Sequence, residues 1–363
     1  MHFPARYTRQ INLRGFGAEA QLKLQNARVL VVGAGGLGLP ALQYLAAMGV
    51  GTLGIADGDI VGITNLNRQI LYYESEVGLS KAAASSDKLA RQNPSITIKT
   101  FDTYLSVENA IQIIRDFDVV IDATDNFGAR YLINDACVIL GKPFIYGAIQ
   151  EYEGHVSVFN YKEGPTYRCL YPDIPTSDEI PDCNTAGVLG VVPGIIGCHQ
   201  ALEAVKVITG VGKPASGYLN IFDFLHNDQY EVKLKANPEN RQIRHLKESY
   251  TLPVCSTIPT MQVQELYHWF NSGKKFLLLD VREKHEYDSV HFEKSLLSPL
   301  STFSPGDLHL VDQVPVVVHC QQGGRSIRAA SLLRERFKDI EVYSVDGGIE
   351  RWKKEIGSKM LIS

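Results

Sequence analysis

The sequence has few cysteines, no large excess of charge of either sign and no long hydrophobic run. Six irregularly spaced cysteines in 363 residues are too few for a disulfide scaffold, so we expect free thiols in a reducing cytoplasm. The 36 basic and 40 acidic residues leave a formal net charge of −4. This balance argues against general nucleic-acid or anionic-membrane binding, which depends on clustered positive charge. The longest uncharged apolar stretch, 186–198, is broken by glycine and proline and falls short of the ~20 residues of a membrane span.

The first half of the chain alternates strand-like and helix-like segments. The apolar, strand-like runs are 28–33, 52–57, 117–122 and 143–148. Helical stretches separate these runs, which predicts a parallel sheet with helices on its faces. The segments 155–161 and 218–235 alternate like antiparallel strands, so we expect a mixed sheet. Residues 162–185, rich in Pro, Asp and Thr, are expected to form a long surface loop.

A second, smaller α/β pattern follows a stretch with no clear period. Strand-like runs at 276–281 and 314–319 and a helical stretch at 326–337 mark this second pattern. We therefore predict an α/β protein with a first domain at 1–240, a linker at 241–257 and a small α/β domain at 258–363.

A glycine-rich turn follows the first strand. Gly33-Ala34-Gly35-Gly36-Leu37-Gly38 fits G-x-G-x-x-G between a strand and a helix. Glycines allow close approach of a phosphate to the backbone, and the helix N-terminus supplies N–H donors. Asp57 ends the next strand, where a carboxylate can accept hydrogen bonds from ribose hydroxyls. These features predict a nucleotide site, for which NAD is the usual occupant.

Polar residues farther along favour a triphosphate over NAD. They are Asn65, Arg68, Gln69, Lys81, Asp125 and Asn126. Cations and a strand-end carboxylate near a nucleotide suit ATP with Mg²⁺, because nucleotidyl transfer depends on positioning and charge neutralisation. Hydride transfer does not need these groups. An NAD-dependent oxidoreductase remains an alternative on the glycine turn and Asp57 alone.

Together these motifs resemble the MoeB/ThiF group of ubiquitin-activating-enzyme-like adenylyltransferases. The shared motifs are Arg6-Tyr7-x-Arg9-Gln10, Gly15-Phe16-Gly17, G-x-G-G-L-G at 33–38, A-D-G-D at 56–59, N-L-x-R-Q at 65–69, Lys81 and T-D-N at 124–126. The resemblance covers about residues 5–235. It implies a Rossmann-like domain that uses ATP to adenylylate the C-terminal glycine of a small ubiquitin-like sulfur-carrier protein ending in Gly-Gly.

The resemblance also assigns roles to single residues. It implies that Asp57 holds the ribose, that Asn65, Arg68 and Lys81 bind the phosphates, and that Asp125 binds Mg²⁺. It further implies that Arg9 reaches into the site of the neighbouring subunit in a homodimer.

The chain departs from this family at one position. Many members bind a structural zinc through two Cys-x-x-Cys pairs, a tetrahedral Cys₄ site. Here the pairs are reduced to Thr166-Tyr167-Arg168-Cys169 and Asn240-Arg241-Gln242-Ile243. A single thiol cannot make such a site, so structural zinc is predicted to be absent.

Two cysteines are candidates for chemistry. Cys183 lies in a polar loop before an apolar segment, and a thiol at a helix start can be a nucleophile. It matches the position where relatives carry a cysteine able to link to the carrier, although an incidental loop cysteine is an equal alternative. Cys320 begins the stretch Cys320-Gln321-Gln322-Gly323-Gly324-Arg325, which follows a strand and opens a helix. Loop amides, the helix dipole and Arg325 would stabilise a thiolate or persulfide there.

The second half resembles a rhodanese. The matching landmarks are Leu279-Asp280-Val281-Arg282-Glu283, Glu286-Tyr287, His291 and Asp346-Gly347-Gly348-Ile349-x-x-Trp352. Cysteine-dependent phosphatases use a similar loop, but they place five residues between Cys and Arg, where this chain has four. The shorter loop favours a sulfurtransferase.

The fusion of the two halves suggests a joint reaction. A carrier adenylate made in the first domain would be attacked by a persulfide on Cys320, and a second thiol, Cys183, would help to release the thiocarboxylate. The sulfur would come from a donor such as a cysteine desulfurase or thiosulfate. This is the pattern of molybdopterin-synthase adenylyltransferase/sulfurtransferases; related thiamine, cysteine and tRNA-thiolation pathways, and a non-catalytic carrier-binding scaffold, are alternatives.

Overall fold

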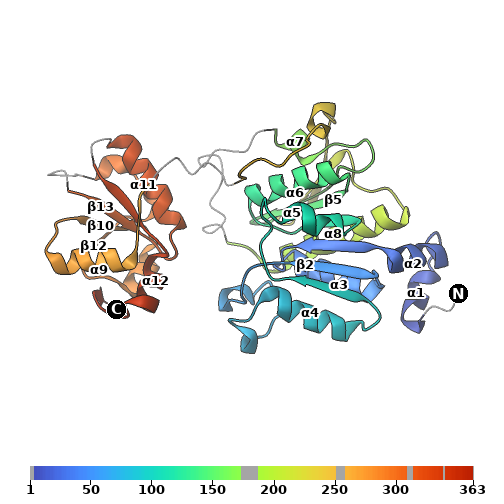
Figure 1. Ribbon diagram of the computed structural model, residues 1–363, viewed down its shortest axis with the longest axis horizontal. Helices are drawn as coiled ribbons and strands as arrows, with labels where there is room; N and C mark the ends of the chain where they lie inside the picture. The colour runs from blue at the N-terminus through green and yellow to red at the C-terminus, as the bar shows by residue number, and fades with distance from the viewer. Residues whose placement is uncertain (1–3, 173–186, 251–257, 309–313, 338–339, 363) are drawn as a thin grey trace. The chain divides into compact units, whose positions relative to one another are not determined.

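The computed structural model describes residues 4–172, 187–250, 258–308, 314–337 and 340–362 (Figure 1). The chain divides into two compact units, Met1–Leu252 and Pro253–Ser363. The division falls inside the predicted linker of 241–257. Cys183 and Cys255 lie outside the described residues.

The first unit is built on an eight-stranded mixed sheet with the order β3-β2-β1-β4-β5-β6-β7-β8. Its strands are β1 (Arg28–Val32), β2 (Thr52–Ala56), β3 (Thr97–Phe101), β4 (Val119–Asp122), β5 (Phe144–Gln150), β6 (Glu153–Phe159), β7 (Tyr218–Asp223) and β8 (Asp228–Lys233). The strands from β3 to β5 are parallel, and β6, β7 and β8 are antiparallel. The predicted mixed sheet is therefore confirmed.

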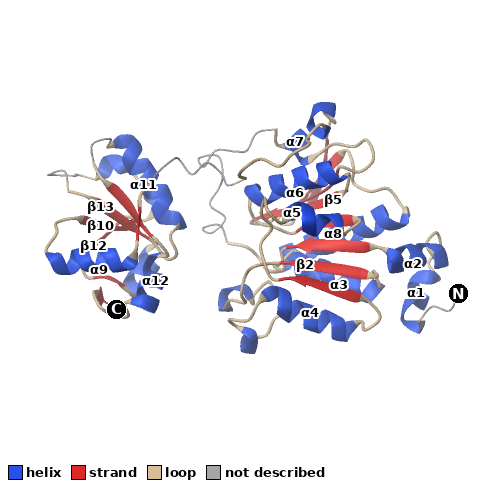
Figure 2. Ribbon diagram, in the orientation of Figure 1, coloured by secondary structure: helices blue, strands red, loops and turns tan. Residues whose placement is uncertain are grey.

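Helices cover both faces of this sheet (Figure 2). They are α1 (Thr8–Ile11), α2 (Gly17–Asn26), α3 (Gly38–Met48), α4 (Lys81–Gln92), α5 (Ala110–Arg115), α6 (Phe127–Leu140), α7 (Tyr167–Leu170) and α8 (Val191–Thr209), with the 3₁₀ turns η1 (Ala5–Tyr7), η2 (Ile63–Asn65), η3 (Glu74–Glu76) and η4 (Pro238–Arg241). Side chains along β1 alternate between two cores. Val29 and Val31 pack with α2, α3, α4 and α8, whereas Leu30 and Val32 pack with α5 and α6.

Helix α8 is long and apolar enough, by length and composition, to cross a membrane. About half of it is buried inside the protein. A Cβ atom at Gly197 would lie 2.2 Å from the carbonyl oxygen of Leu37, so α8 approaches the start of α3 very closely. We interpret α8 as a helix of the protein core.

Several elements were not apparent in the sequence pattern. Strand β3 is an edge strand whose residues are mostly exposed, so its segment shows no apolar alternation. The region 162–185, which we expected to be a loop, contains the short helix α7, and residues 173–186 lie outside the described part of the chain.

The second unit has a five-stranded parallel sheet with the order β12-β10-β13-β14-β9. Its strands are β9 (Thr260–Met261), β10 (Leu277–Asp280), β12 (Ser295–Leu297), β13 (Val316–His319) and β14 (Val342–Val345); β11 (His291–Phe292) and β15 (Leu361–Ile362) form a small antiparallel pair. The helices are α9 (Val263–Ser272), α10 (Lys284–Ser289), α11 (Gly324–Arg336) and α12 (Gly348–Glu355), with η5 (Leu300–Thr302) and η6 (Pro305–Asp307). Trp269 of α9 and Trp352 of α12 pack on one face of the sheet, and α11 packs on the other.

Candidate functional site

The first candidate site is formed by the carboxyl ends of three neighbouring strands. Strands β2, β1 and β4 lie side by side, and backbone hydrogen bonds continue past their ends. The amide of Gly33 donates to Ala56 O at 2.8 Å, and the amide of Ala123 donates to Val32 O at 2.9 Å. The glycine turn, Asp57 and the 122–126 segment are therefore brought together, as the sequence motifs predicted.

Two glycines of this turn, Gly33 and Gly38, are required by space, and Gly33 is also required by its backbone conformation. Gly33 has φ +99°, and a Cβ there would lie 2.6 Å from Ala123 O. A Cβ at Gly38 would lie 1.8 Å from Gly33 O, so the first turn of α3 can pack against β1 only without a side chain. A Cβ at Gly36 would lie 3.1 Å from the side chain of Pro193 and 3.5 Å from that of Arg68, whereas a Cβ at Gly35 would lie 3.7 Å from Gln69 Nε2, an ordinary contact distance.

Asp57 holds the glycine turn in place. It is buried, and its Oδ2 accepts a hydrogen bond from the amide of Ala34 at 2.6 Å while Oδ1 accepts one from the amide of Asp59 at 2.7 Å. Burial raises the pKa of Asp57, and these two amides and Lys81 counter only part of the rise. Asp57, which the sequence predicts to bind the ribose, therefore also stabilises the glycine turn.

Lys81 is held beside Asp57 by a second carboxylate. Its Nζ lies 2.9 Å from Asp59 Oδ2, and the Lys81 side chain is only 7% exposed. The Tyr104 hydroxyl donates to the other oxygen of Asp59. Burial alone would raise the pKa of Asp59, but the hydrogen bonds from Tyr104 and Lys81 hold it below its ordinary value. A buried ammonium at this edge is suited to bind phosphate.

The N-L-x-R-Q segment lies next to the glycine turn, and its polar side chains differ in their hydrogen bonds. Asn65 Oδ1 accepts from the amide of Gly62 at 3.0 Å, and Arg68 Nη1 donates to Thr64 O at 3.0 Å. Gln69 is 4% exposed, and its Oε1 has no hydrogen-bond partner among the described residues. A buried acceptor without a donor beside a glycine turn fits a ligand that carries N–H or O–H groups, as adenosine does.

Strand β4 ends in two carboxylates with different surroundings. Asp122 is fully buried, and burial raises its pKa. Its Oδ1 accepts from the Thr124 amide and hydroxyl at 3.0 and 2.6 Å, and its Oδ2 has no hydrogen-bond partner in the described part of the chain. Asp125 is exposed and lies beside Asn126. Asn126 Oδ1 caps α6 by accepting from the Ala129 amide at 2.8 Å, so Asn126 has a structural role as well.

These groups fit a nucleoside triphosphate with Mg²⁺. The helix N-terminus of α3 and the side chains of Arg68 and Lys81 present positive charge to phosphates. Mg²⁺ is usually held by one or two carboxylates together with substrate phosphates, and Asp125 is an exposed carboxylate just past the end of β4.

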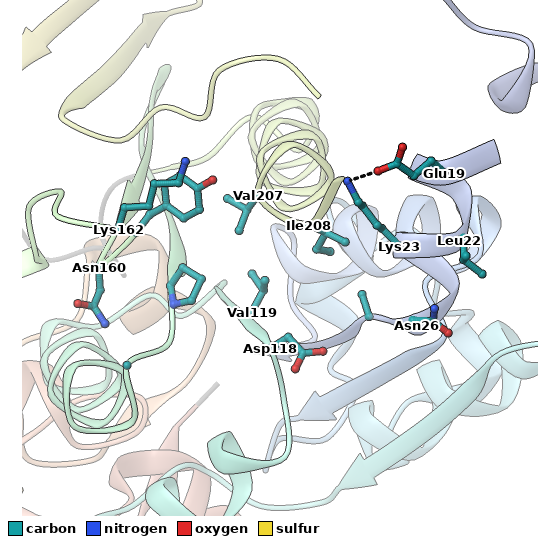
Figure 3. A pocket seen from close by; sticks show the side chains of 14 residues that line it. Glu19, Leu22, Lys23, Asn26, Asp118, Val119, Asn160, Lys162, Val207 and Ile208 are labelled. Atoms are coloured by element: carbon teal, nitrogen blue, oxygen red, sulfur yellow. Dashed lines mark ion pairs between the residues drawn. The ribbon is translucent and has the colours of Figure 1, made fainter. Parts of the chain in front are cut away.

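An open cavity of the first unit lies at the opposite edge of the sheet (Figure 3). It has a volume of about 640 Å³ and is lined by Ala27, Val119 and Pro143, which lie at or just before the starts of β1, β4 and β5. Glu19 and Lys23 of α2 also line the cavity, and they form an ion pair in which Lys23 Nζ lies 2.9 Å from Glu19 Oε1. Because this edge holds the amino ends of the strands, the cavity is separate from the nucleotide site.

The remnant of the zinc motif is held by hydrogen bonds. Cys169 Sγ accepts from the amides of Asn237 and Thr166 at 3.3 and 3.4 Å and from Asn240 Nδ2 at 3.4 Å. Burial raises the pKa of Cys169, but these hydrogen bonds outweigh burial and bring it below its ordinary value. One thiol with hydroxyl and amide neighbours does not fit a Cys₄ zinc site. No group of three or more His, Cys, Asp or Glu suited to a metal occurs among the described residues.

The second candidate site is Cys320, at the end of β13. The residue is 1% exposed, and its Sγ accepts a hydrogen bond from the amide of Gly323 at 3.1 Å. Gly323 has φ +112°, a conformation suited to glycine. The sequence predicted that loop amides would stabilise the sulfur, and in the structure the amide of Gly323 donates a hydrogen bond to it. The hydroxyl of Ser326 lies 3.6 Å from Sγ on the other side.

Charged side chains brace the Cys320 loop from outside. Arg325 forms two hydrogen bonds of 2.6 and 2.7 Å with Glu286 of α10, so its charge is compensated. Burial would raise the pKa of Glu286, but Arg325 holds it below the ordinary value. Glu350 of α12 accepts from the amide groups of Gln321 and Gln322 at 3.1 and 2.9 Å. The loop side chains are therefore fixed from two helices.

The first turn of α12 also fixes the loop backbone. The amides of Ile349 and Glu350 donate to the carbonyls of Cys320 and Gln321 at 2.9 and 3.1 Å. A Cβ at Gly348 would lie 2.3 Å from Cys320 O, and Gly348 has φ +56°. This contact explains the second glycine of the D-G-G motif; the first, Gly347, has φ +68°.

The remaining predicted site residues are placed as follows. Arg9 is exposed on α1. Cys137 is fully buried in α6, and Cys198 is half-buried in α8, consistent with packing roles. The partners Asp59, Tyr104, Glu286, Glu350 and Ser326 were not identified from the sequence. Asp59, Glu286 and Ser326 had a signal, because Asp59 and Glu286 belong to the quoted motifs and Ser326 directly follows the Cys320–Arg325 stretch.

Comparisons with known proteins agree with this arrangement. A family model described as the ThiF family matches residues 7–244, and one described as the rhodanese-like domain matches residues 262–355. A probable molybdopterin-synthase adenylyltransferase of Porphyra purpurea is 40% identical over 98% of this chain and 94% of its own length. The probable adenylyltransferase/sulfurtransferase MoeZ of Mycobacterium tuberculosis is 36% identical over 99% of this chain and 95% of its own. Among solved structures, E. coli MccB with ATP shares the fold, with a TM-score of 0.56 and 21% identity over 65% of this chain and 72% of that one.

Proposed function

The chain belongs to the ThiF family and continues into a rhodanese-like domain, and from this we propose that it adenylylates and then sulfurates a small ubiquitin-like sulfur-carrier protein. The observation that carries the proposal is the presence, in one chain, of two features: a glycine turn held by Asp57 near Lys81, and Cys320, whose sulfur accepts a hydrogen bond from the loop amide of Gly323. The names of the relatives favour the carrier subunit of molybdopterin synthase as substrate.

The first reaction joins the carrier to AMP. The C-terminal glycine carboxylate of the carrier attacks the α-phosphorus of ATP, and pyrophosphate leaves. Arg68 and Lys81 neutralise the phosphates, and Asp57 accepts from the ribose hydroxyls. Asp125 would hold Mg²⁺, which would supply further positive charge for the phosphates.

The second reaction transfers sulfur. The Cys320 thiolate takes a sulfane sulfur from a persulfide or thiosulfate, and the donor leaves as a thiolate or sulfite. The terminal sulfur of the Cys320 persulfide attacks the carrier adenylate and releases AMP, which leaves an acyl disulfide. A second thiol, for which we propose Cys183, attacks the Cys320 sulfur and releases the thiocarboxylate; a cellular dithiol then reduces the resulting disulfide. The cysteines are sparse, and those in the described part of the chain are free thiols, which favours the cytoplasm, where thiols are maintained.

Exchange of labelled pyrophosphate into ATP tests the first reaction. Asp125→Ala and Arg68→Ala are each expected to abolish carrier-dependent exchange and to leave thiosulfate sulfurtransfer unchanged. Asp116→Ala, which removes an exposed carboxylate paired with Lys99, is the matched control and should retain exchange. Exchange at the wild-type rate in both site variants would refute the triphosphate site.

Mass spectrometry of the carrier tests the second reaction. With ATP and a persulfide donor, Cys320→Ala should form the adenylate but little thiocarboxylate, whereas Cys198→Ala should form both. A normal thiocarboxylate yield from Cys320→Ala, with free sulfide excluded, would show that the second unit is not the sulfur source.

We further propose that the active form is a homodimer in which Arg9 serves the neighbouring site. The support is that Arg9 is exposed on α1 and matches a family motif. Inactive Arg9→Ala and Asp125→Ala chains should then restore part of the activity when mixed. An absence of restoration, with subunit exchange verified, would place Arg9 outside the neighbour's site.

A further inference from the structure

A pair of buried, hydrogen-bonded serine side chains adjoins the sulfur of Cys320. Ser326 is in the first turn of α11, and Ser344 is in β14. They are 0% and 1% exposed, and their Oγ atoms are 2.8 Å apart. Ser326 Oγ lies 3.6 Å from Cys320 Sγ. The reaction described above gives neither serine a role.

The positions of the hydrogen atoms follow from the available acceptors. Gly323 O can only accept, so the Ser326 hydroxyl donates to it at 2.8 Å. Because a hydroxyl has a single hydrogen, the hydrogen between the two serines must come from Ser344. The thiol of Cys320 then donates to Ser326 Oγ. In this state Ser326 donates once and accepts twice, which fills its hydrogen-bonding capacity.

Loss of the Cys320 proton changes this pattern. The sulfur can no longer donate and becomes a charged acceptor, which favours any hydroxyl that can turn toward it. The Ser326 hydroxyl can rotate from Gly323 O to Sγ. Gly323 O is not left without a partner, because the amide of Ile327 donates to it at 3.2 Å. Ser344 continues to donate to Ser326 and polarises its O–H bond.

We propose that Ser326 is a catalytic hydroxyl that turns to donate to the Cys320 thiolate, and that Ser344 is the residue that positions and polarises it. With the amide of Gly323, Ser326 then gives the sulfur two donors. The inference rests on the proposed function, in which Cys320 is the sulfur-carrying nucleophile.

The donors act on the charge that changes during sulfur loading. The Cys320 thiolate attacks the sulfane sulfur of a persulfide donor, a new S–S bond forms, and the donor's own S–S bond breaks to release a thiolate. Stabilising the resting thiolate increases the fraction of enzyme that can react at neutral pH. The same hydroxyl supports Cys320 when a cellular dithiol attacks the Cys183 sulfur of the Cys183–Cys320 disulfide, because Cys320 then leaves as a thiolate.

The serine substitutions leave the ionisable groups around the loop unchanged. Arg325 is paired with Glu286, Arg282 is paired with Asp280, and the Glu350 carboxylate accepts hydrogen bonds from the loop glutamines. His319, in the strand before Cys320, lies 3.5 Å from Asp280, and burial lowers its pKa to about 4, so it is neutral at pH 7. A change in the pH profile of a serine variant is therefore attributable to the hydroxyl groups.

The test is the rate of alkylation of Cys320 by iodoacetamide as a function of pH, measured on the full chain by mass spectrometry of the Cys320 peptide. Ser326→Ala is expected to move the midpoint of the profile upward by about one pH unit, which lowers the rate about tenfold below the midpoint. Ser326→Thr, which keeps a hydroxyl, should return the midpoint toward wild type. Ser331→Ala is the control, because Ser331 lies on the same helix and donates to Ile327 O.

A double substitution tests the part played by Ser344. Ser344→Ala alone should shift the midpoint upward by less than Ser326→Ala does. In the Ser326→Ala background, Ser344→Ala should add no further shift, because Ser344 acts through Ser326. Additive shifts would overturn the coupling between the two serines.

The outcome separates this inference from the proposed function. Alkylation requires no carrier, ATP or sulfur donor, so it reports on Cys320 even if carrier sulfuration is not observed. A Ser326→Ala midpoint equal to that of wild type and of Ser331→Ala, in protein with native tryptophan fluorescence, would overturn the inference. Failure of Ser326→Thr to restore the profile would assign the effect to packing and overturn it equally.

Discussion

Two half-buried thiols of the first unit, Cys169 and Cys198, differ in what surrounds the sulfur. Cys169 accepts hydrogen bonds from residues 237, 240 and 166, which bring its pKa below the ordinary value, whereas burial raises the pKa of Cys198. At a given pH, more of Cys169 is therefore thiolate. We expect Cys169 to be alkylated several-fold faster than Cys198 at pH 8, as quantified by peptide mass spectrometry.

The buried Cys137 serves as the unreactive reference in this measurement. Asn240→Ala should slow the alkylation of Cys169 by removing one donor, without affecting Cys198. Equal rates for Cys169 and Cys198 would contradict the prediction. Elemental analysis of the same preparation tests the mismatch with a zinc site, and we expect it to find no stoichiometric zinc.

The ion pair of Glu286 and Arg325 predicts a pH dependence of stability in the second unit. Because the pKa of Glu286 is lower in the folded protein than its ordinary value of 4.5, the folded state binds this proton less readily. The stabilisation is complete above about pH 4.5 and is lost as the pH falls toward the folded pKa. Glu286→Gln should lower the unfolding temperature at pH 7, and this difference should shrink below about pH 4.5.

Tryptophan fluorescence measures this effect directly, because both tryptophans, Trp269 and Trp352, lie in the second unit. Asp288→Asn is the matched control, because Asp288 is on the same helix in an exposed pair with Lys284 and should change stability little. A difference between Glu286→Gln and wild type that stays constant down to pH 3 would contradict the assignment.

At the scale of elements, the start of α12 and the Cys320 loop form one structural unit. A Cβ at Gly348 would lie within 2.6 Å of the carbonyl oxygens of both Cys320 and Gln321, and the positive φ adds strain. Gly348→Ala should therefore destabilise the second unit by about 2 kcal/mol or more and greatly reduce sulfurtransfer. Tryptophan fluorescence during thermal unfolding and a thiosulfate assay measure the two effects.

Gly324→Ala provides the comparison for stability. No atom lies within 4 Å of a Cβ at Gly324, and this glycine is in the first turn of α11. Its substitution should be neutral or slightly stabilising, because alanine favours the helix. Equal stability of the Gly348→Ala and Gly324→Ala variants would show that the loop and α12 can separate without cost.

At the scale of the whole molecule, each unit has its own hydrophobic cores. A ligand that binds one unit should stabilise that unit alone. ATP with Mg²⁺ at about 100 times its dissociation constant should stabilise the first unit by about 2.7 kcal/mol. In calorimetry the transition of the first unit should shift upward, while the tryptophan-reported transition of the second unit should not move.

Asp125→Ala supplies the control for this experiment, because ATP should then shift neither transition. An equal upward shift of both transitions in the wild-type chain would show that the two units unfold as one cooperative block. The prediction of independent domains would then be wrong.

Features made of contiguous residues could be predicted from the sequence. The glycine turn at 33–38 and the Cys320 loop each depend on the backbone freedom and size of neighbouring residues, so their motifs are complete in a short stretch. The parallel strands β1, β2, β4 and β5 were also recognisable, because buried strands form continuous apolar runs. The exposed edge strand β3 has no such run and was missed.

The partners of the polar side chains were decided only by the tertiary structure. Ser344 meets Ser326 from a different element, Arg325 meets Glu286 across 39 residues, and Asn240 meets Cys169 across 71. The spacing between such partners depends on the path of the chain and leaves no local signal. The sequence by itself therefore determined which chemical groups each site contains. The fold decided which of those groups are braced, neutralised or free to turn, because hydrogen bonds and ion pairs form only at short range.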